Sequence, residues 1–96
     1  MNKHFYIYIL ASKKNGTLYV GVTSDIIKRI YEHKNSLTEG FTNKYGVKDL
    51  VYYEIYDDAE NAIKREKQIK TFRRNWKIDL IVKDNPDWKD LYDTLF

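Results

Sequence analysis

The sequence predicts a mixed α/β fold of the α+β type, in which a three-stranded, mainly antiparallel sheet is flanked by helices. Three segments of six or seven apolar and aromatic residues are typical of strands, and longer segments carry apolar residues at helical spacing. In chain order the elements read strand, strand, helix, strand and then three helices. A sheet covered by helices is the natural packing for this order, although the order does not fix which strands are neighbours.

The first half of the chain is expected to form a hairpin and a helix. The pair Asn15-Gly16 lies between two strand-like segments and is a strong signal for a two-residue turn, because both turn residues take positive φ. The run 23–25, Thr-Ser-Asp, supplies side chains that cap the start of a helix. The two strands, the helix and a following polar loop are expected at residues 5–10, 17–22, 23–37 and 38–49.

The second half is expected to form one strand and three helices. Asp57-Asp58 opens a long helix that bends into a second one, and Asn85-Pro86 resembles a cap followed by proline at the first helical position. The strand and the helices are expected at about residues 50–56, 57–73, 76–82 and 86–95.

Length and composition indicate one globular domain over residues 1–96. The chain is 43% hydrophobic and 16% aromatic, which is typical of a folded protein and not of a disordered one. It has no cysteine, so disulfides and thiolate-bound zinc are excluded. No segment approaches the roughly 20 apolar residues of a membrane helix. With no secretory signal in view either, we expect a cytoplasmic protein that does not enter a membrane.

Basic charge is concentrated in two blocks, although the net charge is only +3. Residues 1–48 hold eight Lys or Arg against three acids, and residues 64–77 hold seven against one. Residues 49–63, between the blocks, carry five acids and no Lys or Arg. This pattern fits a surface that faces a polyanion, and equally a solvated helix face.

Strand alternation places two phenols on one face of the hairpin. A two-residue turn pairs Lys14 with Thr17 and brings Tyr8 and Tyr19 to the same face, with Gly21 leaving space beside them. Tyrosine is also simply a good strand residue, so this observation alone favours no function.

The first helix places a histidine on its apolar stripe of Ile26, Ile30 and Leu37. A lone histidine there is usually a core residue, but Arg29 lies one turn before His33. Because the two groups compete for the same acceptors, their proximity favours a site that receives an anion.

The second helix places Glu66 within a stripe that includes Ala62, Ile69 and Trp76. A carboxylate facing the core costs several kcal/mol unless it is paired or metal-bound. A structural pair with Lys70 or Arg73 explains it, and so does a metal ligand at the floor of a basic cleft. The metal ligand is favoured, because a pair seven residues apart is a long reach.

Several short pieces, in this order and spacing, resemble the GIY-YIG nuclease family. They are Tyr6-Ile7-Tyr8, Tyr19-Val20-Gly21, Arg29 with His33, Gly40-Phe41-Thr42, Arg65-Glu66-Lys67 and Asn85-Pro86-Asp87-Trp88. The likeness spans nearly the whole chain and is strongest to small stand-alone members. Tyr6 replaces the name-giving glycine and Val20 the isoleucine.

The resemblance implies a metal-dependent endonuclease. Glu66 would be the sole protein ligand of one Mg²⁺ or Mn²⁺ ion, which suits a cation that keeps its waters. Arg29 would bind the scissile phosphate. Tyr8 would activate water and Tyr19 orient it, or the reverse, and His33 would assist proton transfer or hold a tyrosine in place.

The expected partner is nucleic acid, with DNA favoured, and it is cut with little sequence specificity because target choice in larger members comes from appended domains. A structure-selective role in repair or recombination fits this expectation, and a non-catalytic nucleic-acid-binding module is the alternative. The loop 39–46 mixes aromatics and lysine, which suits base and phosphate contacts but also an ordinary surface loop. Candidate backbone contacts are Lys44, Lys70, Arg73, Arg74 and Lys77.

Overall fold

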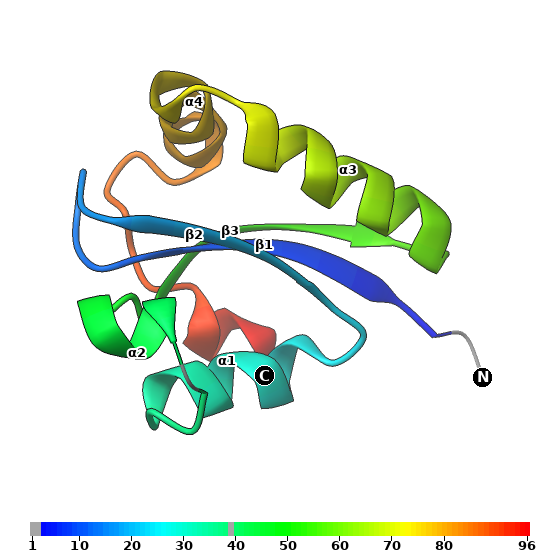
Figure 1. Ribbon diagram of the computed structural model, residues 1–96, viewed down its shortest axis with the longest axis horizontal. Coiled ribbons are helices and arrows are strands. Elements are labelled where there is room, and N and C mark those ends of the chain that lie inside the picture. The colour runs from blue at the N-terminus through cyan, green and yellow to red at the C-terminus, as the bar shows by residue number, and fades with distance from the viewer. Residues whose placement is uncertain (1–2, 39) are drawn as a thin grey trace.

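A sheet lies between two layers of helices in the computed structural model, which describes residues 3–38 and 40–96 (Figure 1). The strands are β1 (Phe5–Ala11), β2 (Leu18–Thr23) and β3 (Asp49–Tyr56). They are antiparallel and lie in the order β2-β1-β3, so β1 is central and β2 forms one edge. The predicted α+β fold and the order of its main elements are confirmed.

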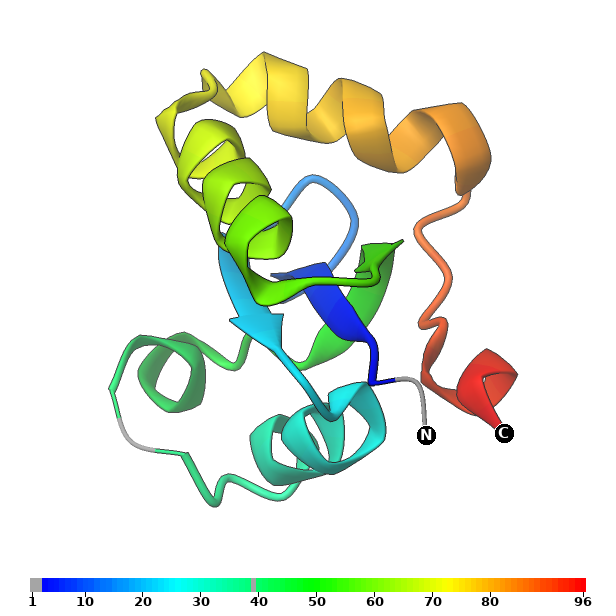
Figure 2. The same cartoon turned by 90° about the vertical axis from the view of Figure 1, so that its right-hand side faces the viewer.

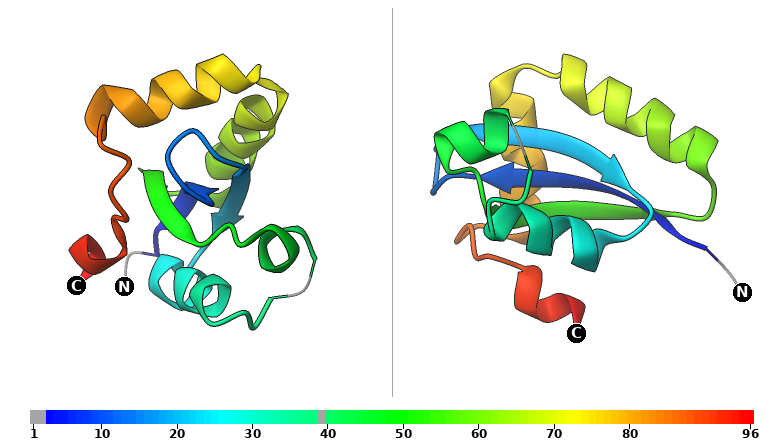
Figure 3. Two further views of the ribbon diagram at one scale, coloured as in Figure 1. Left: turned by 90° about the vertical axis from the view of Figure 1, so that its left-hand side faces the viewer. Right: turned by 60° about the horizontal axis from the view of Figure 1, so that its bottom comes forward.

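The helices divide between the two faces of the sheet. One face carries α3 and α4, and the opposite face carries α1, α2 and the 3-10 helix η1 (Figures 1 and 3). The helices are α1 (Ile26–Lys34), α2 (Phe41–Tyr45), α3 (Ala59–Thr71), α4 (Arg74–Asp84) and η1 (Tyr92–Leu95). None of the helices in the described part of the chain is long and apolar enough to cross a membrane.

The central strand supplies apolar side chains to both layers because successive residues point to opposite faces. Ile7 and Ile9 pack into the cluster under α3 and α4. Tyr8 and Leu10 pack into the cluster on the opposite face, whose helical members come from α1 and η1. All four are at most 2% exposed, so Tyr8, a predicted catalytic residue, is fixed within the core.

The hairpin turn differs from the prediction, although its consequence for the site survives. Gly16 N donates to Lys13 O at 2.9 Å and Ser12 N to Thr17 O at 3.0 Å, so the loop holds four residues instead of two. Of the Asn15-Gly16 pair, only Asn15 has positive φ. Pairing therefore shifts by two residues, and an even shift leaves every side chain on its predicted face.

The first helix ends earlier than expected, and a further helix replaces part of the predicted loop. α1 begins at the cap Asp25, whose carboxylate accepts from Lys28 N at 3.1 Å, and ends at Lys34. Leu37 is therefore outside the helix and 65% exposed. The helix α2 forms within the segment 38–49, where Glu39 lies outside the described residues.

The long helix is held against the sheet by a partly buried ion pair. Arg65 of α3 donates to both carboxylate oxygens of Glu54 on β3, at 3.0 and 3.1 Å. Burial alone would raise the pKa of Glu54, but hydrogen bonds from Arg65 and from two tyrosines hold it below its ordinary value. This lock fixes the rotation of α3 and thereby the direction in which Glu66 points.

The end of the chain does not form the predicted helix over residues 86–95. Asn85 follows α4, and its side chain amide donates to Val51 O at 3.1 Å and to Lys89 O at 2.9 Å. This buried amide folds the segment into a turn against β3, so only residues 92–95 are helical.

Candidate active site

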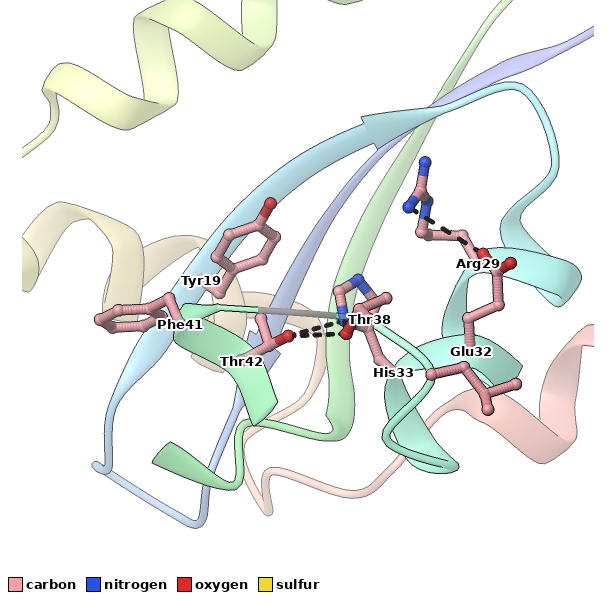
Figure 4. Close-up of a pocket in the computed structure, with 8 residues that line it drawn as sticks. Tyr19, Arg29, Glu32, His33, Thr38, Phe41 and Thr42 are labelled. Atoms are coloured by element: carbon pink, nitrogen blue, oxygen red, sulfur yellow. Dashed lines mark hydrogen bonds and ion pairs between the residues drawn. The ribbon is translucent and has the colours of Figure 1, made fainter. Parts of the chain in front are cut away.

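A cavity of about 360 Å³ opens between β2, α1 and α2 (Figure 4). In Figure 4 the ring of Tyr19 and the guanidinium of Arg29 lie on either side of the imidazole of His33. The cavity is lined by Tyr19, Arg29, Glu32, His33, Leu37, Thr38, Phe41 and Thr42. Three of the five predicted catalytic residues therefore share one cavity.

Hydrogen bonds on both ring nitrogens fix the imidazole of His33. Nε2 lies 3.2 Å from the hydroxyl of Tyr8, and Nδ1 lies 3.0 Å from Oγ1 of Thr42 and 3.3 Å from Oγ1 of Thr38. The side chain is 4% exposed. A buried phenol needs an acceptor for its proton, so Nε2 is best assigned as that acceptor and Nδ1 as the protonated nitrogen.

The environment keeps His33 neutral. Burial lowers the pKa of His33, and the charge of Arg29 lowers it further, while Glu32 opposes both. A neutral imidazole can accept the proton of Tyr8, which an imidazolium cannot. The predicted pairing of a cation and a histidine one helical turn apart therefore has an electrostatic consequence in the fold.

Tyr8 lies behind the cavity and Tyr19 lies at its wall. Tyr8 is 2% exposed, and its ring centroid is 6.3 Å from that of Tyr19 and 5.9 Å from that of His33. Burial raises the pKa of Tyr8, and Tyr19 raises it further. The positive charge of Arg29 opposes this rise, as expected for a group that lies near the phenol.

Gly21 is required by the position of Tyr8. The two residues face each other across the β1–β2 pair, and a Cβ at Gly21 would lie 2.4 Å from both Cζ and the hydroxyl of Tyr8. The expected space beside the phenols is thus occupied by the phenol of Tyr8 itself.

Arg29 extends toward solvent at the mouth of the cavity. Its side chain is 45% exposed, and its nearest acid is Glu32, with N and O atoms 3.9 Å apart. A pair this long and this exposed leaves the guanidinium able to bind an anion.

Glu66 projects from the opposite helical layer. Its side chain is 13% exposed, and Oε2 lies 2.9 Å from Nζ of Lys70. The charge of Glu66 raises the pKa of Tyr8, which places the carboxylate within electrostatic range of that phenol. None of the described α3 residues lines the cavity, but α3 and α1–α2 flank the same β2 edge of the sheet (Figure 2).

Glu66 is chemically suited to hold a divalent cation with water as the remaining ligand. Across residues 3–38 and 40–96, no three His, Asp or Glu side chains are grouped so as to bind a metal. A single carboxylate fits Mg²⁺, which retains most of its waters. Its ion pair with Lys70 is the structural pairing that the sequence left open as the alternative to a metal ligand.

The predicted backbone contacts occupy two places. Lys44 lies on α2 beside the cavity, and the other four lie on α3, α4 and the turn between them. Arg74 donates to Asn15 O and Gly16 O at 2.6 Å, so it also fastens the hairpin turn. Arg73 is the exposed cap residue before α4, and Trp76 lies within α4, so neither belongs to the α3 stripe.

Sequence reasoning missed the two threonines that hold His33. Thr42 belongs to the Gly40-Phe41-Thr42 motif, which was recognised only as part of a family pattern, and Thr38 carried no local signal. A buried histidine needs hydrogen-bond partners for both ring nitrogens, but this requirement does not indicate which groups supply them.

Comparison with known proteins identifies the family. The model of the GIY-YIG catalytic domain matches residues 4–91. The chain belongs to the GIY-YIG family. The match covers both helical layers and every predicted catalytic residue.

Small proteins of similar length are its relatives within this family. A UPF0213 protein of Staphylococcus saprophyticus is 46% identical over 81 residues, covering 84% of this chain and 96% of the relative. A UPF0213 protein of Clostridium perfringens is 40% identical over 76 residues, covering 79% and 81% of the two chains. The solution NMR structure of a UPF0213 protein from Bacillus halodurans has a TM-score of 0.56 at 28% identity, covering 91% and 92%.

Membership of the GIY-YIG family implies an endonuclease that acts on nucleic acid, since this domain is the catalytic domain of such enzymes. Nucleases of this family generally depend on a divalent metal ion.

Proposed function

We propose that this GIY-YIG domain is a divalent-metal-dependent endonuclease that hydrolyses phosphodiester bonds in DNA with little sequence specificity. The observation that carries the proposal is the cavity at the β2 edge, which Tyr19, Arg29 and His33 line, with Tyr8 hydrogen-bonded to His33 behind it. A phosphate at the mouth of this cavity would meet a guanidinium and a phenol, with a neutral imidazole behind them.

Arg29 supplies the phosphate-binding group. Its exposed guanidinium forms charge-assisted hydrogen bonds with phosphoryl oxygens and favours the charge that accumulates on them in the transition state. Glu66 would hold Mg²⁺ or Mn²⁺, which when bound stabilises negative charge on the phosphate and on the departing 3′ oxygen.

Tyr8 and Tyr19 differ in their access to the attacking water. A base must reach the attacking water, and Tyr8 is almost fully buried while Tyr19 lines the cavity. This favours the assignment in which Tyr19 activates the water and Tyr8, behind it, helps to orient it. His33 accepts the proton of Tyr8 in a hydrogen bond and so holds that ring against Gly21.

Cleavage of plasmid and branched DNA tests the proposal. The purified protein is incubated with each DNA in Mg²⁺ or Mn²⁺ and then with a chelator, alongside Glu66→Gln and the control Glu60→Gln. Glu60 lies on the same helix but is exposed in its first turn. We expect metal-dependent nicking that Glu66→Gln lowers by at least about 10²-fold, as for loss of a group that stabilises transition-state charge.

Two results would contradict the proposal. Salt-sensitive binding without cleavage under any metal condition would indicate a non-catalytic nucleic-acid-binding module. Equal cleavage by the Glu66→Gln and Glu60→Gln variants would remove Glu66 from the site.

A further inference from the structure

A row of three aromatic rings leads out of the cavity along α2. The rings of Tyr19 and Phe41 are stacked at 27° with centroids 6.3 Å apart, and Phe41 contacts Tyr45 with centroids 4.8 Å apart. Figure 4 shows Phe41 beside Tyr19 at one end of the cavity. We call Tyr19, Phe41 and Tyr45 the aromatic row.

The outer members of the aromatic row are too exposed to serve the core. Phe41 is 45% exposed and Tyr45 is 50% exposed, whereas Tyr19 packs partly against the core cluster of that face. Single exposed apolar residues are ordinary. Two that touch each other, with their rings tilted at 48°, extend the aromatic wall of the cavity toward solvent.

Positive charge accompanies the aromatic row. Nζ of Lys44 lies 5.4 Å from the centroid of the Tyr45 ring, and Arg29 lies at the other end of the cavity. Aromatic rings interleaved with cations are the combination that binds single-stranded nucleic acid, because rings stack on bases while cations contact phosphates.

We propose that the aromatic row stacks unpaired bases next to the scissile phosphate, so that the favoured substrate carries a single-stranded segment at the cut site. The inference rests on the proposed function and names its substrate class. In a continuous duplex both faces of each base are covered by neighbouring bases, so the row gains nothing from it. In a tail, a gap or a single strand, bases can turn onto Phe41 and Tyr45 while Lys44 contacts the backbone.

Binding of defined oligonucleotides without cleavage tests this substrate class. Fluorescence anisotropy in chelator gives the affinity for a single strand, for the blunt duplex of the same sequence and for that duplex with a single-stranded tail. A fluorescent purine analogue in the unpaired segment reports stacking by the loss of its emission. We expect the single strand and the tailed duplex to bind more tightly than the blunt duplex, with quenching of the analogue.

Substitutions in α2 separate stacking from general attraction to DNA. We expect Phe41→Ala to weaken single-strand binding by about tenfold and to abolish quenching, as for loss of one stacked base. Phe41→Trp keeps a ring and should retain both. Tyr31→Ala is the matched control, because Tyr31 is 52% exposed on α1 and outside the row. Circular dichroism confirms that each variant is folded.

The inference is overturned if blunt duplex and single strand bind equally, or if folded Phe41→Ala behaves like Tyr31→Ala. Because binding is measured without metal, this failure is distinct from a failure of the nuclease proposal. Cleavage of blunt duplex without any stacking would support the nuclease proposal and contradict the role of the aromatic row in binding bases.

Discussion

At the scale of single residues, His33 links the buried and exposed parts of the site. Its Nε2 faces the phenol of Tyr8 and its Nδ1 faces the hydroxyl of Thr42. If Nδ1 is held protonated by donating to Thr42, Nε2 remains an acceptor for Tyr8. The threonine therefore acts on Tyr8 through the tautomer of the imidazole.

Replacing Thr42 by valine tests this relay. The Thr42→Val variant keeps the shape of the side chain but removes the hydroxyl at 3.0 Å from Nδ1. We expect a loss of about 0.5–1.5 kcal/mol in the free energy of unfolding, because Nδ1 loses the nearer of its two hydroxyl partners and retains Thr38, and a lower rate of DNA cleavage at unchanged DNA affinity. Thr42→Ser retains the hydroxyl and should keep both properties, so equal behaviour of the two variants would refute the relay.

The lowered pKa of His33 predicts a dependence of stability on pH. Its folded pKa lies below the ordinary value of 6.5, so the unfolded chain binds this proton more tightly. The contribution to stability is complete above pH 6.5 and is lost as the pH falls through the folded pKa. Urea unfolding at a series of pH values should show this loss in the wild type and in His4→Gln, but not in His33→Gln. A loss of the same size in His33→Gln would assign it to other groups.

At the scale of elements, the β1–β2 hairpin positions the site. The β1–β2 pairing places Gly21 opposite Tyr8 and Tyr19 opposite Leu10. Both phenols therefore face α1, which carries Arg29 and His33. The missing side chain at Gly21 lets the ring of Tyr8 lie flat across β2.

A methyl group at position 21 should disturb both the fold and the site. In the Gly21→Ala variant the new Cβ would lie 2.4 Å from the ring of Tyr8. Overpacking of this kind in a core costs about 1–3 kcal/mol of stability. We expect lower stability in urea unfolding and slower cleavage. Combining Gly21→Ala with Tyr8→Ala removes the clash. The double variant should therefore lose less stability than the sum of the losses in the two single variants. Full additivity would show that the ring of Tyr8 does not press on position 21.

At the scale of the whole molecule, local sequence signals predicted the strands, their faces and the long helices. The two-residue error in hairpin register left Tyr8 and Tyr19 on one face because side chains alternate with a period of two. Extending the helix wheel to Trp76 was wrong, because α3 ends at Thr71 and the chain turns before α4.

The remaining features depend on contacts between distant segments. The helix α2 is five residues long, which is too short for a helical apolar pattern to be visible in the sequence. The turn at Asn85 forms because its amide reaches the carbonyl of Val51, and a cap followed by proline looked the same in sequence. The sequence likewise indicated Glu66 without its distance from the hairpin, since that distance depends on the Arg65–Glu54 lock between α3 and β3.

The placement of cations in both helical layers predicts how the molecule holds DNA. Lys44 lies on α2 and Arg73 caps the start of α4, so a DNA strand that crosses the β2 edge between the layers would contact both. Each lost phosphate contact should lower the slope of log binding constant against log salt concentration by about 1. We therefore expect slopes smaller by about 1 for Lys44→Ala and for Arg73→Ala and by about 2 for the double variant, with no change in Lys83→Ala at the far end of α4. Binding titrations at several salt concentrations measure these slopes, and an unchanged slope in the double variant would exclude a DNA path across both layers.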